Sequence, residues 1–157
     1  MIESVKIQQA LGDNVLAVHH IGSTSIPSIL AKPIIDILVE ASQIEDVDQR
    51  SGCMSDLGYE VMDEYGIEGR RYFRKSDKKG NRTFHVHAFE RASSHIVQHL
   101  VFRDFLLAHP QRAKEYSDLK TALSDDGVIS KTEYQNAKTS FIRATQEDAI
   151  KWYQNQK

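Results

Sequence analysis

The sequence predicts an α/β (α+β) fold, with a small mixed β-sheet flanked by helices in its first part and helices alone in its second. Two apolar runs, 15–18 and 34–39, are typical of buried strands. Residues 82–90 instead alternate between side chains of two kinds, as the two faces of a strand require. From about residue 93 the apolar residues recur at helical spacing. This change in the spacing of apolar residues divides the chain into a first part with strands and a second part with helices alone.

Turn residues separate the expected elements of the first part. These elements are, in order, a helix at 2–11, strands at 15–18 and 34–39, a helix at 42–57, and strands at 59–62, 70–75 and 82–90. Ser42 and Glu45 have the spacing of a capping box that begins a helix, and Gly58 suits the position after its end. Residues 77–81 predict the turn that joins the last two strands into a hairpin.

Wide apolar faces predict three helices in the second part. The first begins near Ser93 and ends before His109-Pro110, because proline disfavours the helical conformation in the residue before it. The second covers 111–123, and the third runs from 131 to about 153. No internal repeat or linker separates these helices from the sheet, so we expect them to pack on it.

Length and composition favour one ordinary globular domain over residues 1–157, with an α/β part at about 1–92 and a helical part at about 93–157. Hydrophobic residues make up 40% and charged residues 27% of the chain. The net charge is −2, from 20 basic and 22 acidic residues. This balance provides no general attraction to nucleic acid or to a membrane surface.

Targeting features predict a cytoplasmic protein. Cys53 is the only cysteine, which excludes a disulfide within the chain and fits a reducing compartment. The first residues lack the basic and apolar regions of a signal peptide. No apolar stretch approaches the roughly 20 residues that span a bilayer.

The turn after the first strand is a candidate anion site. Gly22 is followed by three hydroxyl residues, Ser23, Thr24 and Ser25, which suit the start of a short helix. Backbone N–H groups at such a helix start favour a phosphate, and glycine permits a close approach of the backbone. The alternative is a plain strand-to-helix turn with a capping serine.

Asp36 lies in a very apolar strand, where an unpaired charge would cost several kcal/mol. It shares a strand face with Leu38 and Glu40. A carboxylate in this setting requires a metal ion, a hydrogen-bond network or a cation. Asp36 is therefore either a ligand at a functional site or the partner of Lys32, an arginine or backbone groups.

His85 and His87 are two residues apart and share one face of the strand at 82–90. Such a pair binds a transition metal or donates hydrogen bonds to a phosphate or to the backbone. Arg71 and Arg74 lie on the neighbouring strand. They are either phosphate-binding groups, together with Lys32, or charges that protect an exposed sheet edge.

The order strand, Gly-Ser turn, short helix and strand with Asp36 resembles the nucleotidyltransferase fold of DNA polymerase β-like enzymes. The detailed pattern, H-x-G-S-T-S-I-P-x-x-x-A-K-P-I-I-D-I-x-V from His20 onward, resembles the GrpB family. Later segments agree, namely 82–90 (R-T-F-H-V-H-A-F-E), 99–106, His109-Pro110 and 116–120. The resemblance extends from about Val15 to the C-terminus.

The nucleotidyltransferase resemblance implies a divalent metal cofactor, Mg²⁺ or Mn²⁺ before Zn²⁺. In that fold two carboxylates one residue apart hold the ions. Here Asp36 matches the first carboxylate but Leu38 stands at the second, which puts two-metal catalysis in doubt. A mixed set of Asp36, His85 and His87, with His20 nearby, is the alternative metal site, and Asp36 and His87 are the candidate catalytic residues.

Three functions are consistent with these residues and with the resemblance. The first is a nucleotidyltransferase that binds its nucleotide at Gly22, Ser23 and Asp36. The second is a non-catalytic module that binds a nucleotide or a coenzyme A precursor, and the third is a metal-dependent hydrolase that uses the histidines. In each case the expected partner is a nucleotide or a phosphorylated small molecule.

Overall fold

The computed structural model describes residues 2–22, 25–26, 34–124 and 131–156. The chain divides into two compact units. One comprises Met1–Gly22 and Pro33–Ile96, and the other comprises Ser23–Lys32 and Val97–Lys157. We call them the sheet unit and the helical unit. That the two units act as one domain stays a prediction.

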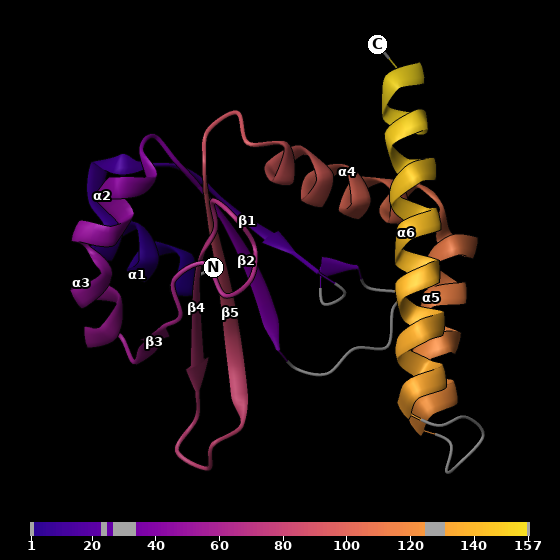
Figure 1. The fold of residues 1–157 in the computed structure, drawn as a ribbon, viewed down its shortest axis with the longest axis horizontal. Coiled ribbons are helices and arrows are strands. Elements are labelled where there is room, and N and C mark those ends of the chain that lie inside the picture. Colours follow the sequence, from indigo (N-terminus) through magenta and orange to yellow (C-terminus); the bar gives the residue numbers. More distant parts are fainter. Residues whose placement is uncertain (1, 23–24, 27–33, 125–130, 157) are drawn as a thin grey trace. The chain divides into compact units, whose positions relative to one another are not determined.

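The sheet unit contains a five-stranded mixed sheet (Figure 1). Its elements are α1 (Ile2–Leu11), the 3₁₀ turn η1 (Gly12–Asn14), β1 (Val15–Ile21), β2 (Ile35–Ala41), α2 (Ile44–Gln49), α3 (Ser51–Asp56), β3 (Tyr59–Val61), β4 (Arg71–Ser76) and β5 (Arg82–Glu90). The strand order is β1-β2-β5-β4-β3. The central pair, β2 and β5, is parallel, and the other pairs are antiparallel. The predicted fold class is therefore confirmed.

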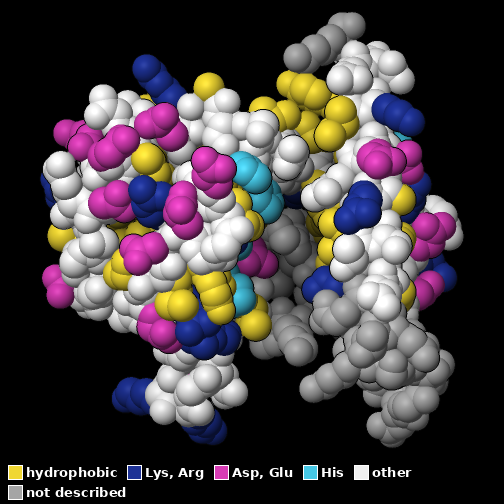
Figure 2. Space-filling view, in the orientation of Figure 1, with side chains coloured by type: hydrophobic (Ala, Val, Ile, Leu, Met, Phe, Trp, Pro, Cys, Tyr) yellow, Lys and Arg dark blue, Asp and Glu magenta, His cyan; other side chains and the backbone are white. Residues whose placement is uncertain are grey.

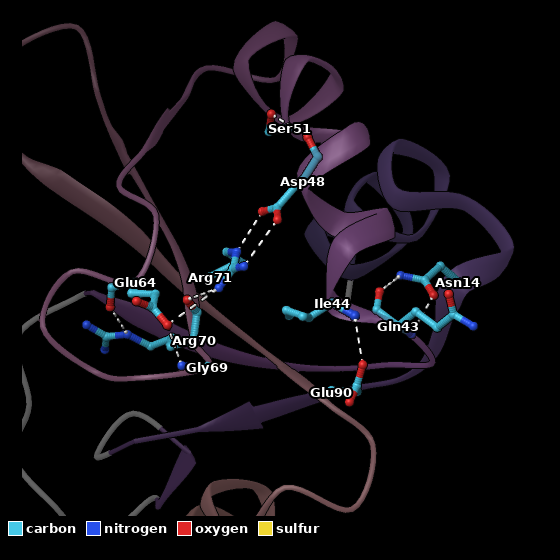
Figure 3. Close-up of polar contacts among 10 residues, drawn as sticks. All are labelled: Asn14, Gln43, Ile44, Asp48, Ser51, Glu64, Gly69, Arg70, Arg71 and Glu90. Carbon is cyan, nitrogen blue, oxygen red and sulfur yellow. Dashed lines mark hydrogen bonds and ion pairs between the residues drawn. The ribbon is translucent and has the colours of Figure 1, made fainter.

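The predicted helix at 42–57 is instead two short helices, α2 and α3, separated at Arg50. The capping box at Ser42 was also a wrong prediction, since Gln43 is the N-cap residue and makes no side-chain cap. The free N–H of Ile44 donates instead to the Glu90 carboxylate at the end of β5, at 3.2 Å (Figure 3). A tertiary contact thus replaces the local cap.

One face of the sheet is covered by α1, α2 and α3 (Figure 1). We call it the core face, and it consists of Ile37, Val39, Phe73, Val86 and Ala88. These side chains are at most 1% exposed and pack against apolar residues of the three helices, namely Ile7, Leu11, Val47 and Met54. Because successive side chains of a strand alternate between faces, the residues next to these core residues point to the opposite face of the sheet.

A buried polar contact fixes α1 on the core face. The Tyr59 hydroxyl donates to Glu3 Oε2 at 2.5 Å, and Lys75 Nζ lies 3.2 Å from the same oxygen. Burial, together with the hydrogen bond to Glu3, holds the pKa of Tyr59 far above its usual range. Tyr59 therefore stays protonated and acts as a donor to the Glu3 side chain.

The helical unit contains most of α4 (Ser94–Ala108), together with α5 (Pro110–Ser124) and α6 (Lys131–Asn155). Its core joins all three helices through Phe105, Leu106, Ala113, Tyr116 and Ala149. Helices α5 and α6 lie side by side (Figure 1). Within the described part of the chain, none of the helices has the length and apolar character needed to cross a membrane.

Candidate functional site

The second face of the sheet is polar at its centre. We define the polar face by Asp36 on β2, His85 and His87 on β5, and Tyr72 and Arg74 on β4. The register brings these side chains together, because Asp36 pairs with His85, His85 with Arg74, and His87 with Tyr72. Residues that pair directly across strands share a face. The sequence prediction that Asp36 and both histidines belong together thus agrees with the sheet register.

Asp36 lies between the two histidines. Its Oδ1 is 3.2 Å from His87 Nε2 and 3.5 Å from His85 Nδ1. Burial by itself raises the pKa of Asp36, but the hydrogen bonds from His85 and His87 outweigh it and hold that pKa well below its usual range. Asp36 is therefore an ionised carboxylate that orients both imidazole rings.

Arg70 completes this network from the residue before β4. Its Nη1 lies 3.3 Å from His87 Nδ1. A guanidinium only donates hydrogen bonds, so we assign His87 Nδ1 as the acceptor and Nε2 as the protonated nitrogen that donates to Asp36. Hydrogen bonds thus run in one direction, with Arg70 donating to His87 and His87 donating to Asp36.

The Arg70 guanidinium is almost buried, with 8% of the residue exposed. Nε donates to the Glu64 carbonyl oxygen at 3.2 Å (Figure 3). Nη2 donates to the Tyr65 carbonyl oxygen at 2.9 Å. Its Cζ lies 4.6 Å from the centre of the Tyr72 ring. Burial lowers the pKa of Arg70, against a smaller rise from nearby tyrosines, yet a guanidinium remains charged in proteins.

Gly22 lies directly against Asp36. Its φ is +77°, in the left-handed region that favours glycine. A Cβ at this position would come within 2.6 Å of Asp36 Oδ2 and 3.0 Å of Asp36 Cβ. No other residue type fits here without a shift of the carboxylate or the backbone. The turn after β1 therefore begins at the polar face, beside the carboxylate with which the sequence grouped it.

The two predicted phosphate-binding arginines lie on opposite faces of β4. Arg74 is on the polar face and pairs with Glu60 at 3.3 Å. Arg71 points the other way and forms two hydrogen bonds with Asp48 of α2, at 2.6 and 3.1 Å (Figure 3). The structure thus brings Arg74, but not Arg71, together with Asp36.

Other predicted site residues are placed elsewhere or are not described. His20 pairs with Ile37, so it is on the opposite face from Asp36. Ser23, Thr24 and Lys32, predicted to bind phosphate, lie outside the described residues.

The residues around Asp36 do not fit a metal ion as they are arranged. Both histidines direct a nitrogen at the same carboxylate oxygen, Asp36 Oδ1, rather than at a common point beyond it. In the described ranges, no group of three or more His, Cys, Asp or Glu side chains could hold a metal ion. Leu38, where the nucleotidyltransferase resemblance puts a second carboxylate, is fully buried. The divalent-metal cofactor stays a prediction.

Sequence reasoning missed three residues of this region, namely Arg70, Tyr72 and His19. Arg70 and Tyr72 alternate with Arg74, and this spacing of two was the signal that could have placed all three on one face. His19 pairs with Leu38, so it belongs to the same side of the sheet as Asp36. Its Nε2 is buried and has no hydrogen-bond partner among the described residues.

Charges of both signs are mixed on the surface of the sheet unit. Figure 2 shows Asp and Glu side chains spread over the face in view, with Lys and Arg at the tip of the β4–β5 hairpin. A large field of one sign does not cover this face.

Comparison with known proteins identifies the family. Residues 2–148 match the family described as GrpB protein. The chain belongs to the GrpB family. This membership confirms the resemblance that was based on the pattern around Gly22 and Asp36. The nucleotidyltransferase-like character of the GrpB fold stays a prediction.

Relatives within the GrpB family differ in length. The chain is 45% identical over 150 residues to the UPF0157 protein YqkA of Bacillus subtilis, a match that covers 96% of this chain and 43% of YqkA. It is 32% identical over 143 residues to the glutamate-rich protein GrpB of Alkalihalophilus pseudofirmus, covering 89% and 82% of the two chains. The chain thus spans less than half the length of YqkA.

A solved structure supports the fold. The crystal structure of the conserved protein GrpB from Enterococcus faecalis has a TM-score of 0.87 and 40% sequence identity to this chain. The alignment covers 97% of this chain and 90% of the other. The mixed sheet and its flanking helices are therefore shared with a GrpB protein.

Proposed function

We propose that this protein binds a nucleotide or another phosphorylated small molecule at the polar face, with Arg70 as the main anion-binding group. The observation that carries the proposal is the environment of the Arg70 guanidinium. Its three hydrogen-bond acceptors are two backbone carbonyl oxygens and His87 Nδ1, all uncharged. No carboxylate among the described residues forms an ion pair with it.

An almost buried positive charge without a carboxylate partner is costly, and a bound anion offsets that cost. Arg70 carries five N–H donors, of which three are used by the Glu64, Tyr65 and His87 acceptors. The remaining two have no acceptor in the described part of the chain. A planar guanidinium with two free donors suits a phosphoryl group, which accepts a pair of parallel hydrogen bonds.

The position of Gly22 supports the same proposal. A glycine backbone pressed against Asp36 leads into the hydroxyl-rich segment that the sequence assigns to phosphate binding. Asp36 itself repels a phosphate, so its role in the proposal is to position His85 and His87. The phosphoryl group then meets the Arg70 guanidinium, while Asp36 is already hydrogen-bonded to both histidines.

Binding, rather than metal-dependent nucleotidyl transfer, is the function that these contacts favour. Leu38 is buried in place of a second carboxylate, and both histidines are engaged with Asp36. No step in the proposal passes through a metal ion. Transfer and hydrolysis with a divalent metal remain predictions from the resemblance, and the experiment below includes the metal so that they are tested as well.

The test is thermal unfolding and calorimetric titration with ATP, AMP and inorganic pyrophosphate, each in EDTA and in Mg²⁺ or Mn²⁺. A ligand that binds only the native state adds about 2.7 kcal/mol to its stability at one hundred times Kd. We expect Arg70→Gln to weaken binding by at least about tenfold, because a hydrogen bond to a charged group is worth about 1.5–3 kcal/mol. Arg71→Gln is the matched control, since its guanidinium is bound to Asp48 on the other face.

Equal affinity in wild type and Arg70→Gln, or no binding of any of these ligands, would overturn the proposal. If Arg70→Gln fails to fold, Arg70→Lys replaces it, because lysine keeps the positive charge but loses the paired donors of the guanidinium, and this variant should also weaken binding. Asp36→Asn separates binding from chemistry. A pure binding module keeps most of its affinity in this variant, whereas a metal-dependent transferase loses turnover.

A further inference from the structure

Tyr65 is an exposed aromatic residue beside the polar face. About half of it is exposed, 51%, although it belongs to a loop that is otherwise well bonded. Its backbone has φ +46°, and Asp63 in the same loop has φ +53°. Left-handed conformations are uncommon for residues other than glycine, and such strain is retained mainly where the surrounding structure holds it.

The loop between β3 and β4 is held by its own hydrogen bonds. The Gly69 N–H donates to Glu64 Oε2 at 2.6 Å, and the Ile67 N–H donates to the Glu64 carbonyl oxygen at 3.1 Å. At its start, the Tyr72 N–H donates to the Asp63 carbonyl oxygen at 2.8 Å. Arg70 then binds the carbonyl oxygen of Tyr65 itself. The ring of Tyr65 is therefore presented by an ordered loop.

The Tyr65 ring continues a row of rings across the polar face. Its centre lies 5.3 Å from that of Tyr72, at an angle of 33°. Tyr72 in turn lies 5.3 Å from the His87 ring and 5.6 Å from the His85 ring. The Arg74 guanidinium is 5.7 Å from the Tyr65 ring centre. Tyr65 is thus the exposed end of a row whose other end is the Asp36 network.

We propose that the exposed ring of Tyr65 stacks on the base of a nucleotide whose phosphate is bound at Arg70. This inference rests on the proposed function and narrows its ligand class from phosphorylated small molecules in general to nucleotides. The same guanidinium that has free donors for a phosphate also binds the Tyr65 backbone. Tyr65, which carries the ring, and Arg70, which would bind the phosphate, are therefore in direct contact. A mononucleotide requires such proximity, because its base and its phosphate belong to one small molecule.

The chemistry of the neighbours favours a nucleobase over an aliphatic group. Aromatic side chains bind bases of any sequence, because every base has a π-face, and a nearby arginine strengthens such a stack through cation–π contact. A sugar phosphate would leave this ring in water. The local strain at Tyr65 and the loop bonds that maintain it are then explained by the need to hold the ring beside Arg74 and Tyr72.

The test compares the affinities of four nucleoside 5′-monophosphates with that of ribose 5-phosphate, measured by calorimetry on wild type, Tyr65→Asn and Tyr65→Phe. Asparagine tolerates the left-handed backbone, so Tyr65→Asn removes the ring without adding strain. We expect wild type to bind at least one monophosphate about 5- to 150-fold more tightly than ribose 5-phosphate, as one base stack provides. Tyr65→Asn should lose this advantage with its ribose 5-phosphate affinity unchanged, and Tyr65→Phe should keep it.

Each other outcome identifies which proposal fails. If wild type binds ribose 5-phosphate as tightly as every monophosphate, the stacking inference is overturned and the phosphate site at Arg70 stands. If Tyr65→Asn weakens both kinds of ligand equally, Tyr65 supports the loop rather than the base, and the inference is again overturned. If no phosphorylated ligand binds to wild type, both proposals fall together.

Discussion

The two faces of the sheet use the same strands for opposite purposes. On the core face, Phe73 and Val86 are almost fully buried against helices, and their contribution is stability. On the polar face, the adjacent residues Arg74 and His85 are partly exposed and belong to a network of charges and rings. A shift of one position along a strand thus separates residues that fold the protein from residues available to a ligand.

The largest expected difference between the faces lies at two adjacent residues of β4. Phe73→Ala should lower the free energy of unfolding by about 3–5 kcal/mol, because it leaves a cavity in the core where Phe73 is 1% exposed. Arg74→Ala, the matched change on the polar face, should leave stability close to that of wild type, since its partner Glu60 is in solvent. Urea unfolding followed by circular dichroism measures both, and similar losses would contradict the division of roles.

A smaller loss of stability is expected on substitution of Gly22, a position beside the polar face whose left-handed backbone and close contact with Asp36 require glycine. Gly22→Ala should lower the free energy of unfolding by about 2–4 kcal/mol, because alanine disfavours the left-handed conformation and its Cβ would overpack against Asp36. Gly80→Ala is the control, because Gly80 has φ +85° but nothing within 4 Å of an added Cβ, so it should lose only about 1–2 kcal/mol.

The comparison at Gly22 can be sharpened in a second background. In Asp36→Ala the carboxylate is gone but the Cβ that would lie 3.0 Å away remains, so adding Gly22→Ala should lower the free energy of unfolding by less than it does in wild type, though by more than Gly80→Ala does. A cost that stays the same in both backgrounds means that the contact with Asp36 is relieved by a small movement, and that the turn is less constrained than its geometry indicates.

The smallest effect concerns the ion pair of Arg71, the arginine that points away from the polar face. Asp48→Ala should lower the free energy of unfolding by only about 0.2–1 kcal/mol, since Asp48 is half exposed and the pair is screened by solvent. The loss should shrink further in high salt. A larger loss that persists in salt would make this pair a structural support of β4 rather than a surface contact.

The sequence was informative wherever a short period decides the structure. Residues 83–88 alternate between polar and apolar side chains, and β5 has the predicted bounds, Arg82–Glu90, with His85 and His87 on one side. The same rule was available for Arg71 and Arg74, which are three positions apart and must therefore face opposite ways on a strand. Grouping the two arginines by their charge alone hid the importance of Arg70.

Other features could not be predicted because they depend on distant contacts. The helix start at Ile44 is capped by Glu90, which lies 46 residues further along the chain, so no local pattern indicates it. The position of the Arg70 side chain depends on carbonyl oxygens of a loop in which Asp63 and Tyr65 adopt left-handed backbones. Aspartate adopts that conformation more often than most residue types, but tyrosine does so rarely, and so the exposed Tyr65 ring beside the polar face was beyond sequence reasoning.

The parallel pairing of β2 with β5 has a consequence for how the protein folds. His87 and Asp36 are 51 residues apart in the chain, and two helices and two strands lie between them. Closing so long a loop lowers the chain entropy before any stabilising contact has formed, so such pairings form slowly. During synthesis the polar face therefore cannot exist until β5 has emerged, and the ligand binding proposed there should appear only after β5 has paired with β2.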